Sequence, residues 1–279
     1  MIATRGTRTF TPTRVLTYLF LIAAALFYLI PMYVMLVTGF KGFDEISLQT
    51  MWELPKGISF DNFVEAYNNL APAMWNSFRL VIPSAFISSF VGSMNGYILS
   101  KWRFRGSEII FPLLLFGMFI PYQSIMIPLT QFMRVINLYG GIPALILAHV
   151  IYGIPITTLI FRNYYANLPN EILESGRIDG AGFLSIYWYI VLPLSIPSFV
   201  VVLIWQFTQS WNDFLFAVIL TSSENWPVTV ALNNMAGSQI IAWNVQMAGS
   251  FIAALPTLAV YIFLGRYFMR GLMAGALKG

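Results

Sequence analysis

The sequence predicts an all-α membrane protein with six transmembrane helices. Of its 279 residues, 58% are hydrophobic and only 9% are charged, whereas charged residues make up about 25% of a soluble domain. Apolar runs near the length of a bilayer-crossing helix, roughly 20 residues, recur along most of the chain. The predicted spans cover residues 15–37, 77–100, 109–130, 142–161, 194–220 and 247–268. The chain has no cysteine, which excludes disulfides and thiolate chemistry.

Basic residues predict how these spans are oriented. Of the 15 Lys and Arg residues, eleven lie before span 1, between spans 2 and 3, between spans 4 and 5, or at the end of span 6 and beyond it, all on one face of the membrane. The other face has Lys41, Lys56, Arg79 and Arg134. Since cytoplasmic loops carry an excess of Lys and Arg, both termini are predicted to be cytoplasmic. A cleaved signal peptide is the alternative for span 1, but its apolar run is too long and no A-x-A site follows it.

A longer extracytoplasmic segment, residues 38–76, connects spans 1 and 2. Its apolar residues recur at helical spacing with polar residues between them: Phe60, Phe63, Val64, Tyr67 and Leu70. This pattern predicts an amphipathic helix that lies at the membrane interface. Such a helix is more often a structural collar than a binding site.

The cytoplasmic loop between spans 4 and 5 is predicted to form two short helices and a turn. Asn170 is a suitable N-cap, and Glu171 and Glu174 lie where they complement the helix dipole. Asp179-Gly180 supplies the break, because glycine accepts backbone angles that other residues avoid. The second helix repeats apolar side chains at Phe183, Ile186, Tyr187 and Ile190. An apolar helical hairpin of this kind either docks onto a partner or folds back on the chain's own helix ends, and the residues alone favour neither.

The spacing of Glu174 and Gly180, followed by Ile190, Leu192 and Pro193, resembles the EAA loop of permeases in binding-protein-dependent ATP-binding-cassette importers. The loop also occupies the expected place, before the penultimate span. Ser175 and Gly176 stand where that motif has two alanines, and glycine weakens a helix by up to about 1 kcal/mol relative to alanine.

The resemblance continues along nearly the whole chain. Residues 211–214, Trp-Asn-Asp-Phe, and the tail 266–279 are similar to the MalG-like permeases of the carbohydrate-uptake branch, although Met273 replaces an expected threonine. The resemblance implies an N-terminal arm, first span and extracytoplasmic segment at 1–75. It also implies a MetI-like permease core at 76–270, which includes the EAA loop at about 162–193. A cytoplasmic tail follows at 271–279.

This resemblance implies the permease subunit of an importer in a prokaryotic cytoplasmic membrane. Alternating access would carry a sugar, glycoside or small oligosaccharide that an extracytoplasmic binding protein delivers. The implied partners are a MalF-like second permease and two copies of an ATPase, which bind ATP and Mg. The sequence has no G-x-x-x-x-G-K-[ST] phosphate loop, so the motor is a separate chain, and neither enzymatic activity nor a cofactor is expected here. The residues expected to couple to the ATPase are Glu171, Glu174, Arg177, Asp179, Gly180, Ile190, Leu192 and Pro193.

Span 5 offers a candidate translocation path. Its polar and aromatic residues fall on adjoining helical faces: Trp205, Gln206, Gln209, Asn212 and Asp213. Amides and an indole suit a sugar, which presents hydroxyls and C–H groups. Alternatively, these side chains hydrogen-bond to the partner permease. Asp213 is expected near the outer end of the span, where water can solvate it.

His149 in span 4 is the only histidine, and a packed or water-facing ring is favoured over a proton relay. An ion-coupled secondary transporter or channel is the alternative function, but it would need several intramembrane ionisable groups. A membrane-embedded enzyme is disfavoured because no set of catalytic residues converges.

Overall fold

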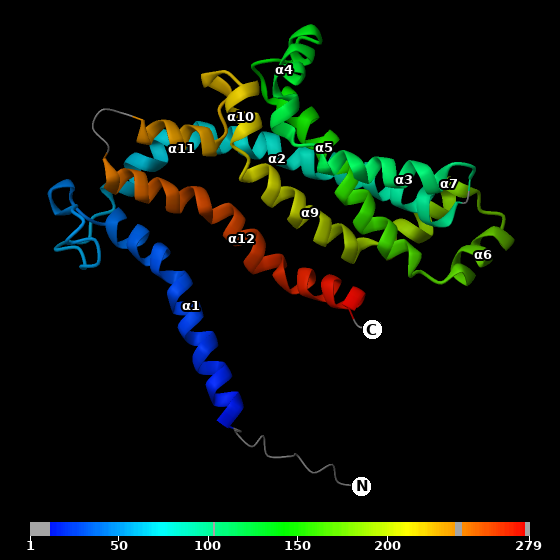
Figure 1. The fold of residues 1–279 in the computed structure, drawn as a ribbon, viewed down its shortest axis with the longest axis horizontal. Coiled ribbons are helices and arrows are strands. Elements are labelled where there is room, and N and C mark those ends of the chain that lie inside the picture. Colours follow the sequence, from blue (N-terminus) through cyan, green and yellow to red (C-terminus); the bar gives the residue numbers. More distant parts are fainter. Residues whose placement is uncertain (1–11, 103, 238–241, 277–279) are drawn as a thin grey trace. The chain divides into compact units, whose positions relative to one another are not determined.

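The computed structural model describes residues 12–102, 104–237 and 242–276, with side chains to Tyr267 (Figure 1). These residues form helices joined by loops. In chain order the elements are α1 (Pro12–Gly39), η1 (Phe43–Glu45), α2 (Asp61–Lys101), α3 (Ser107–Phe116), η2 (Gly117–Phe119), η3 (Tyr122–Ile125), α4 (Met126–Val135), α5 (Ile142–Ala166), α6 (Asn170–Ile178), α7 (Phe183–Ile186), the π-helix η4 (Tyr187–Val191), α8 (Leu192–Leu194), α9 (Ile196–Trp211), α10 (Leu215–Leu220), η5 (Ser223–Asn225), α11 (Val228–Ala236) and α12 (Trp243–Ala276).

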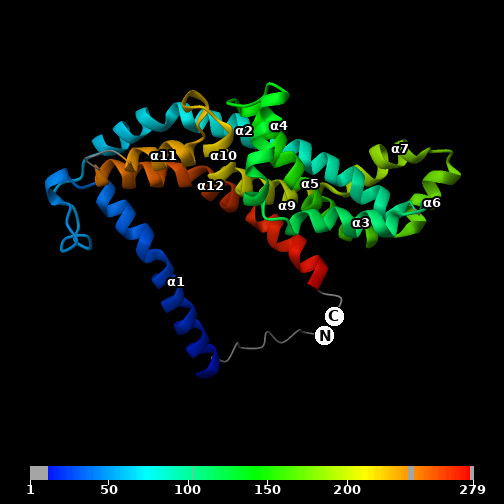
Figure 2. The ribbon, with the colours of Figure 1, turned by 45° about the horizontal axis from the view of Figure 1, so that its top comes forward.

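The chain divides into two compact units. Unit 1 comprises residues 1–68 and 238–252, and unit 2 comprises 69–237 and 253–279. Within unit 2, α11 and the α6–α7 hairpin lie at opposite ends in both views (Figures 1 and 2). The remaining helices of unit 2 therefore separate two regions where a functional site could lie.

The described residues contain four helices long and apolar enough to cross a membrane, namely α1, α2, α5 and α12. Predicted span 3 falls within one bent helix pair, and α9 of predicted span 5 is the second half of another. Ser107–Phe119 and Tyr122–Val135 meet at 87°, and Phe183–Leu194 and Ile196–Trp211 meet at 75°. Proline accounts for both breaks, since Pro121 and Pro197 have no N–H to continue a helical ladder. The described chain thus has four to six candidate spans.

Two predicted elements differ in the structure. The separate interfacial helix expected at 60–70 is wrong, because residues from Asp61 onward are the first turns of the 41-residue α2. Span 5, expected to run unbroken to residue 220, ends as α9 at Trp211, and α10 begins at Leu215. The connection between α9 and α10 belongs to the second candidate site described below.

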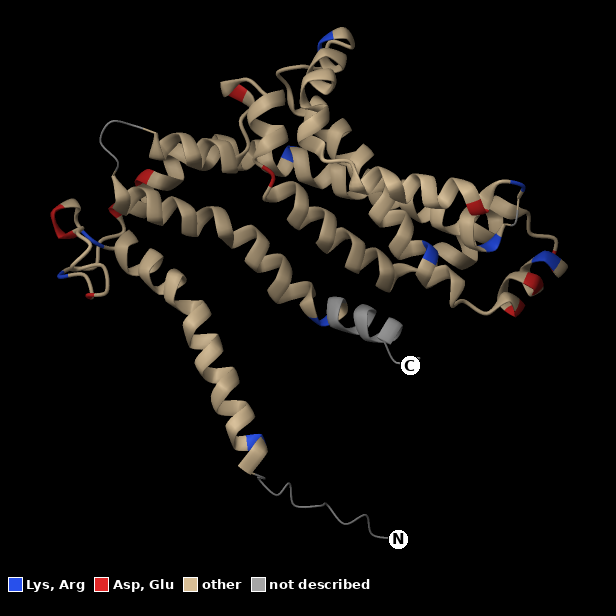
Figure 3. Cartoon of the chain, viewed as in Figure 1, with Lys and Arg blue, Asp and Glu red and all other residues tan. Residues whose placement is uncertain are grey.

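Charged side chains lie mainly in loops and near helix ends (Figure 3). Helix α9 has none, and α1 has only Arg14, in its first turn. A helix without charges along its length is compatible with a hydrocarbon environment, where ionised groups are costly. The distribution therefore agrees with a multi-pass membrane protein.

Helices α2 and α5 approach closely through glycines of α2. A Cβ on Gly92 would lie 2.6 Å from Cβ of Thr157, and a Cβ on Gly96 would lie 2.8 Å from Cβ of Phe161. Thr157 donates its hydroxyl to the carbonyl of Ser88 at 3.0 Å across the same contact. Small residues four apart permit this packing of membrane helices. The G-x-x-x-G pattern at residues 92–96 is the signal in the sequence that indicates such a contact.

Candidate functional site

The hairpin of α6 and α7 at one end of unit 2 is the first candidate site. Its turn has the geometry that the sequence predicted, since Gly180 has a φ of +82°. The N–H of Gly180 donates to the carbonyl of Arg177 at 3.0 Å, and that of Ala181 donates to Gly176 at 2.9 Å. These two bonds form a Schellman motif, which ends a helix with a left-handed residue, usually glycine. The predicted break at Asp179-Gly180 is therefore confirmed.

The beginning of α6 differs from the prediction. Asn170 is the first helical residue and caps nothing with its side chain. Instead its Oδ1 accepts a hydrogen bond from Nζ of Lys101 at 2.9 Å, and Lys101 also donates to the carbonyl of Leu168 at 2.7 Å. The end of α2 is therefore fastened to the start of α6. Beside this contact is an open cleft of about 410 Å³, lined by Ser100, Lys101, Trp102, Asn170, Leu173, Glu174 and Arg177.

The inner face of the hairpin folds back on the chain's own helices. The side chains of Leu173, Ile186, Tyr187 and Val191 are buried in one cluster with residues of α2, α5 and α9. Gly176 belongs to this packing, because a Cβ there would lie 2.7 Å from Cδ1 of Ile190. The glycine that departs from the alanine motif thus makes room for Ile190.

A buried hydroxyl cluster joins the hairpin to the long helices. Oγ of Ser93 in α2 lies 2.6 Å from Oη of Tyr165 in α5 and 3.0 Å from Oη of Tyr187 in η4. Sequence reasoning missed this cluster, because nothing in the local pattern pairs residues 72 and 94 positions apart. Three elements are consequently held together at one point.

The structure divides the predicted coupling residues into two groups. Five are exposed on α6 or its turn: Glu171, Glu174, Arg177, Asp179 and Gly180. Ile190 and Leu192 pack against the buried cluster, and Pro193 is exposed. Large apolar side chains of α6, α7 and η4 are also exposed: Ile178 is 87% exposed, Tyr189 82% and Leu184 56%. The hairpin and η4 thus have a packed side, and their exposed surface in the described structure carries both charged residues of α6 and large apolar side chains.

The second candidate site is a cavity of about 510 Å³ within unit 2, and all five predicted path residues line it. Its wall is formed by η3, α5, α9 and the start of α10. The lining residues are Tyr122, His149, Tyr152, Gly153, Ile156, Trp205, Gln206, Gln209, Ser210, Asn212, Asp213, Phe214, Leu215 and Phe216.

The two glutamines of this cavity have different surroundings. Gln206 is only 3% exposed, and its Nε2 donates to Oγ of Ser88 at 2.8 Å. Its Cδ would lie 3.0 Å from a Cβ on Gly153, so glycine is needed for this side chain to fit. Gln209 is exposed, as are Trp205 and Asn212. Gln206 therefore joins α9 to α2, while the other three present surface to the cavity.

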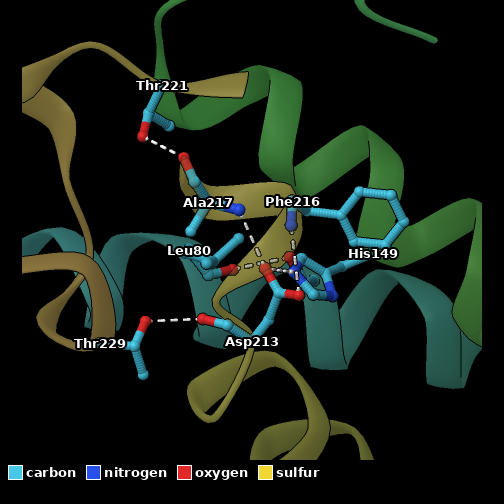
Figure 4. Close-up of polar contacts among 8 residues, drawn as sticks. Leu80, His149, Asp213, Phe216, Ala217, Thr221 and Thr229 are labelled. Atoms are coloured by element: carbon cyan, nitrogen blue, oxygen red, sulfur yellow. Dashed lines mark hydrogen bonds and ion pairs between the residues drawn. The ribbon is translucent and has the colours of Figure 1, made fainter. Parts of the chain in front are cut away.

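Asp213 organises the connection between α9 and α10 (Figure 4). Its carboxylate accepts N–H bonds from Ala217 at 3.0 Å and Phe216 at 3.4 Å, and Thr229 donates its hydroxyl to the Asp213 carbonyl at 2.6 Å. These bonds satisfy N–H groups that the first turn of a helix leaves free. The side chain is 11% exposed and lines the cavity.

His149 lies against the same carboxylate. Its Nε2 is 3.5 Å from Oδ2 of Asp213, and its ring meets Phe216 edge-on at 5.6 Å (Figure 4). The ring is packed, which is one of the two arrangements that were expected, and Asp213 is an acidic neighbour that the sequence alone did not reveal. Among the described residues no group of three potential ligands could hold a metal ion.

Residues 88–273 match the model of the family described as "Binding-protein-dependent transport system inner membrane component". The chain belongs to this family. The permease is 44% identical to the "Probable ABC transporter permease protein" of Pyrococcus horikoshii, over 98% of this chain and all of the relative. It is 33% identical to the glucose import system permease of Saccharolobus solfataricus, over 93% of both chains. It is 34% identical to the xylose/arabinose import permease of Haloferax volcanii, over 94% of this chain and 93% of the relative.

A solved structure shows the same fold. The permease resembles a chain of a bacterial ABC transporter for import of the polysaccharide alginate, with a TM-score of 0.77 and 20% identity. The likeness covers 94% of this chain and all of the other.

The chain is therefore the multi-pass inner-membrane permease subunit of a binding-protein-dependent ABC importer. As the membrane subunit it is not itself catalytic, and the family requires no cofactor of it. Its transporter includes ATPase subunits and a binding protein. The alternative of an ion-coupled transporter or channel is excluded.

Proposed function

We propose that the permease translocates a sugar by alternating access, as the MalG-like half of a heterodimeric pore. A MalF-like second permease, two copies of an ATPase and an extracytoplasmic sugar-binding protein complete the transporter. In this arrangement the bent pair at 107–135 serves as span 3, α9 serves as span 5, and both termini are cytoplasmic. Support comes from relatives at 33% and 34% identity, which are named for import of glucose and of xylose and arabinose.

The hairpin of α6 and α7 is the element that receives movement from the ATPase in this proposal. The supporting observation is that the exposed side chains of α6, such as Ile178 and Glu174, continue into a packed segment in which Tyr187 of η4 contacts Ser93 of α2. A displacement imposed on the exposed side chains of α6 would reach the membrane helices through packed side chains and the hydroxyl cluster. Glu174, exposed beside the cleft at Lys101, would contact the ATPase.

The cavity at α9 is the proposed sugar path. Trp205 offers an aromatic face for sugar C–H groups, and the amides of Gln209 and Asn212 suit sugar hydroxyls. The buried Gln206 and Asp213 would hold these groups in position, Gln206 through Ser88 and Asp213 through α10. The path thus consists of exposed side chains supported by buried ones.

Uptake by the complete transporter in vesicles tests the proposal. Wild-type transporter with its binding protein and internal ATP is expected to accumulate at least one of labelled glucose, xylose, arabinose or a disaccharide. Gly180→Val is expected to abolish uptake and to uncouple ATP hydrolysis from the binding protein, because a β-branched residue is strained at a φ of +82°. Glu174→Lys should have the same effect by reversing a surface charge.

Gly180→Asn is the matched control. A Cβ at Gly180 would meet nothing within 4 Å, so a substitution there changes backbone preference rather than packing. Since asparagine tolerates left-handed angles, this variant should keep much of the transport. Wild-type uptake by Gly180→Val would refute the role of the hairpin. Accumulation of an amino acid, with no sugar among those tested, would refute the cargo.

A further inference from the structure

The chain between α5 and α6 forms a joint at the base of the hairpin. Helix α5 ends at Ala166 and α6 begins at Asn170. The N–H of Leu168 still donates to the carbonyl of Tyr165 at 3.0 Å, which extends the last turn of α5. Pro169 follows, and because proline has no N–H it cannot carry the hydrogen-bond ladder on into α6. The two helices therefore meet at a point about which α6 would be free to rotate.

Lys101, the last residue of α2, spans this joint. Its Nζ donates to the carbonyl of Leu168 on the α5 side at 2.7 Å and to Oδ1 of Asn170 on the α6 side at 2.9 Å. Hydrogen bonds from an ionised donor are stronger than neutral ones. A cation is also favoured where the carbonyls at the end of α5 are left free. One ammonium group thus ties three helices together, and all the atoms involved belong to the permease itself.

Aromatic contacts hold the other helix of the hairpin against the same end of α2. Tyr97 is 3% exposed, and its ring stacks on that of Phe183 in α7 at 4.8 Å. Trp102 meets Phe183 edge-on at 4.9 Å. The end of α2 therefore contacts both helices of the hairpin, α7 through rings and α6 through the ammonium group of Lys101.

We propose that Lys101 is a positioning residue for coupling, which locks the joint so that α6 cannot rotate independently of α2 and α5. Helix α6 has nine residues and is about 14 Å long, so a small rotation at its base would displace its far end and absorb a movement imposed there. With the joint locked, the same movement turns α2 and α5. This role rests on the proposed function of the hairpin as the element that the ATPase moves. Lys101 lies 69 residues before Asn170, outside the predicted coupling loop.

Hydrogen exchange in the complete transporter tests the lock without any solute. Lys101→Met keeps an unbranched stem and removes the donors, so peptides covering 163–175 should exchange several-fold faster than in wild type, because local opening exposes their amides. Lys101→Arg, which keeps a charged donor, should stay near wild type. Asn170→Ala removes one acceptor only and should give a smaller increase. The matched control is Arg105→Met, which removes a positive charge at an exposed position after α2 and should change nothing.

A peptide covering 142–155 of α5 is the internal reference and should exchange equally in all variants. Equal exchange at 163–175 in wild type and Lys101→Met would overturn the lock. So would an increase of the same size in Arg105→Met, because it would show a general effect of charge.

The number of sugar molecules taken up per ATP hydrolysed tests the role in coupling. In vesicles with loaded binding protein, Lys101→Met is expected to hydrolyse ATP near the wild-type rate and to carry several-fold less sugar per ATP. A merely structural defect would reduce the number of assembled transporters, which lowers hydrolysis and uptake together and leaves their ratio unchanged. An unchanged ratio in Lys101→Met would overturn the coupling role. If Gly180→Val were uncoupled at the same time, the proposed function of the hairpin would still stand.

Discussion

The close approach of α2 and α5 makes Gly92 the most informative position for substitution. In Gly92→Ala the new methyl group would lie 2.6 Å from Cβ of Thr157 and 2.9 Å from its backbone carbon, whereas ordinary contact begins at 3.4 Å. The overlap with Cβ is thus about 0.8 Å. Rotating Thr157 about χ1 moves neither atom, so the helices must separate. Overpacking of this kind costs about 1–3 kcal/mol.

The melting temperature of the purified transporter in detergent, measured by size exclusion after heating, is a suitable assay. A loss of 1 kcal/mol lowers it by roughly 2–4 °C for a domain of this size. Gly265→Ala in α12 is the matched control, because it adds the same methyl group to a helical glycine with nothing within 4 Å. Alanine favours helix over glycine by about 1 kcal/mol at both positions, so the difference between the variants isolates the clash. Equal melting temperatures would refute the close packing at Gly92.

Two further changes test the buried polar contacts. Tyr187→Phe removes the hydroxyl that lies 3.0 Å from Ser93 and should lower the free energy of unfolding by about 1 kcal/mol, as measured by melting. The control Tyr189→Phe, at an 82% exposed position, should cause no measurable loss. Identical melting temperatures of the two variants would contradict the hydroxyl cluster. Asp213→Ala leaves the N–H groups of α10 without their carboxylate and should lose about 0.5–2 kcal/mol. Asp213→Asn, which keeps a carbonyl oxygen, should fall between wild type and alanine, and wild-type stability of the alanine variant would show that the cap contributes nothing.

Features that depend on neighbouring residues followed from the sequence. Apolar length identified the long helices, because crossing a bilayer requires a continuous run of apolar side chains. The turn at Gly180 was likewise predictable, since a left-handed residue at a helix end strongly favours glycine. The spacing from Glu174 to Pro193 sufficed to indicate the family. Each of these signals is local and needs no partner from elsewhere in the chain.

The distinctions within the candidate sites required the tertiary structure. Gln206 and Gln209 are chemically identical and three residues apart, yet one is buried against Ser88 and the other is exposed to the cavity. The amphipathic pattern at 60–70 predicted a helix correctly but could not show that it continues into α2.

The break after Trp211 was hidden for a similar reason. An apolar run indicates where a helix can form, but it does not reveal a carboxylate that caps the next helix, as Asp213 does for α10. Hence the sequence by itself determined the membrane class, the hairpin turn and the family. The tertiary structure alone decided which polar side chains fasten helices together and which remain free to meet a solute, because that choice depends on partners 72 to 118 residues away.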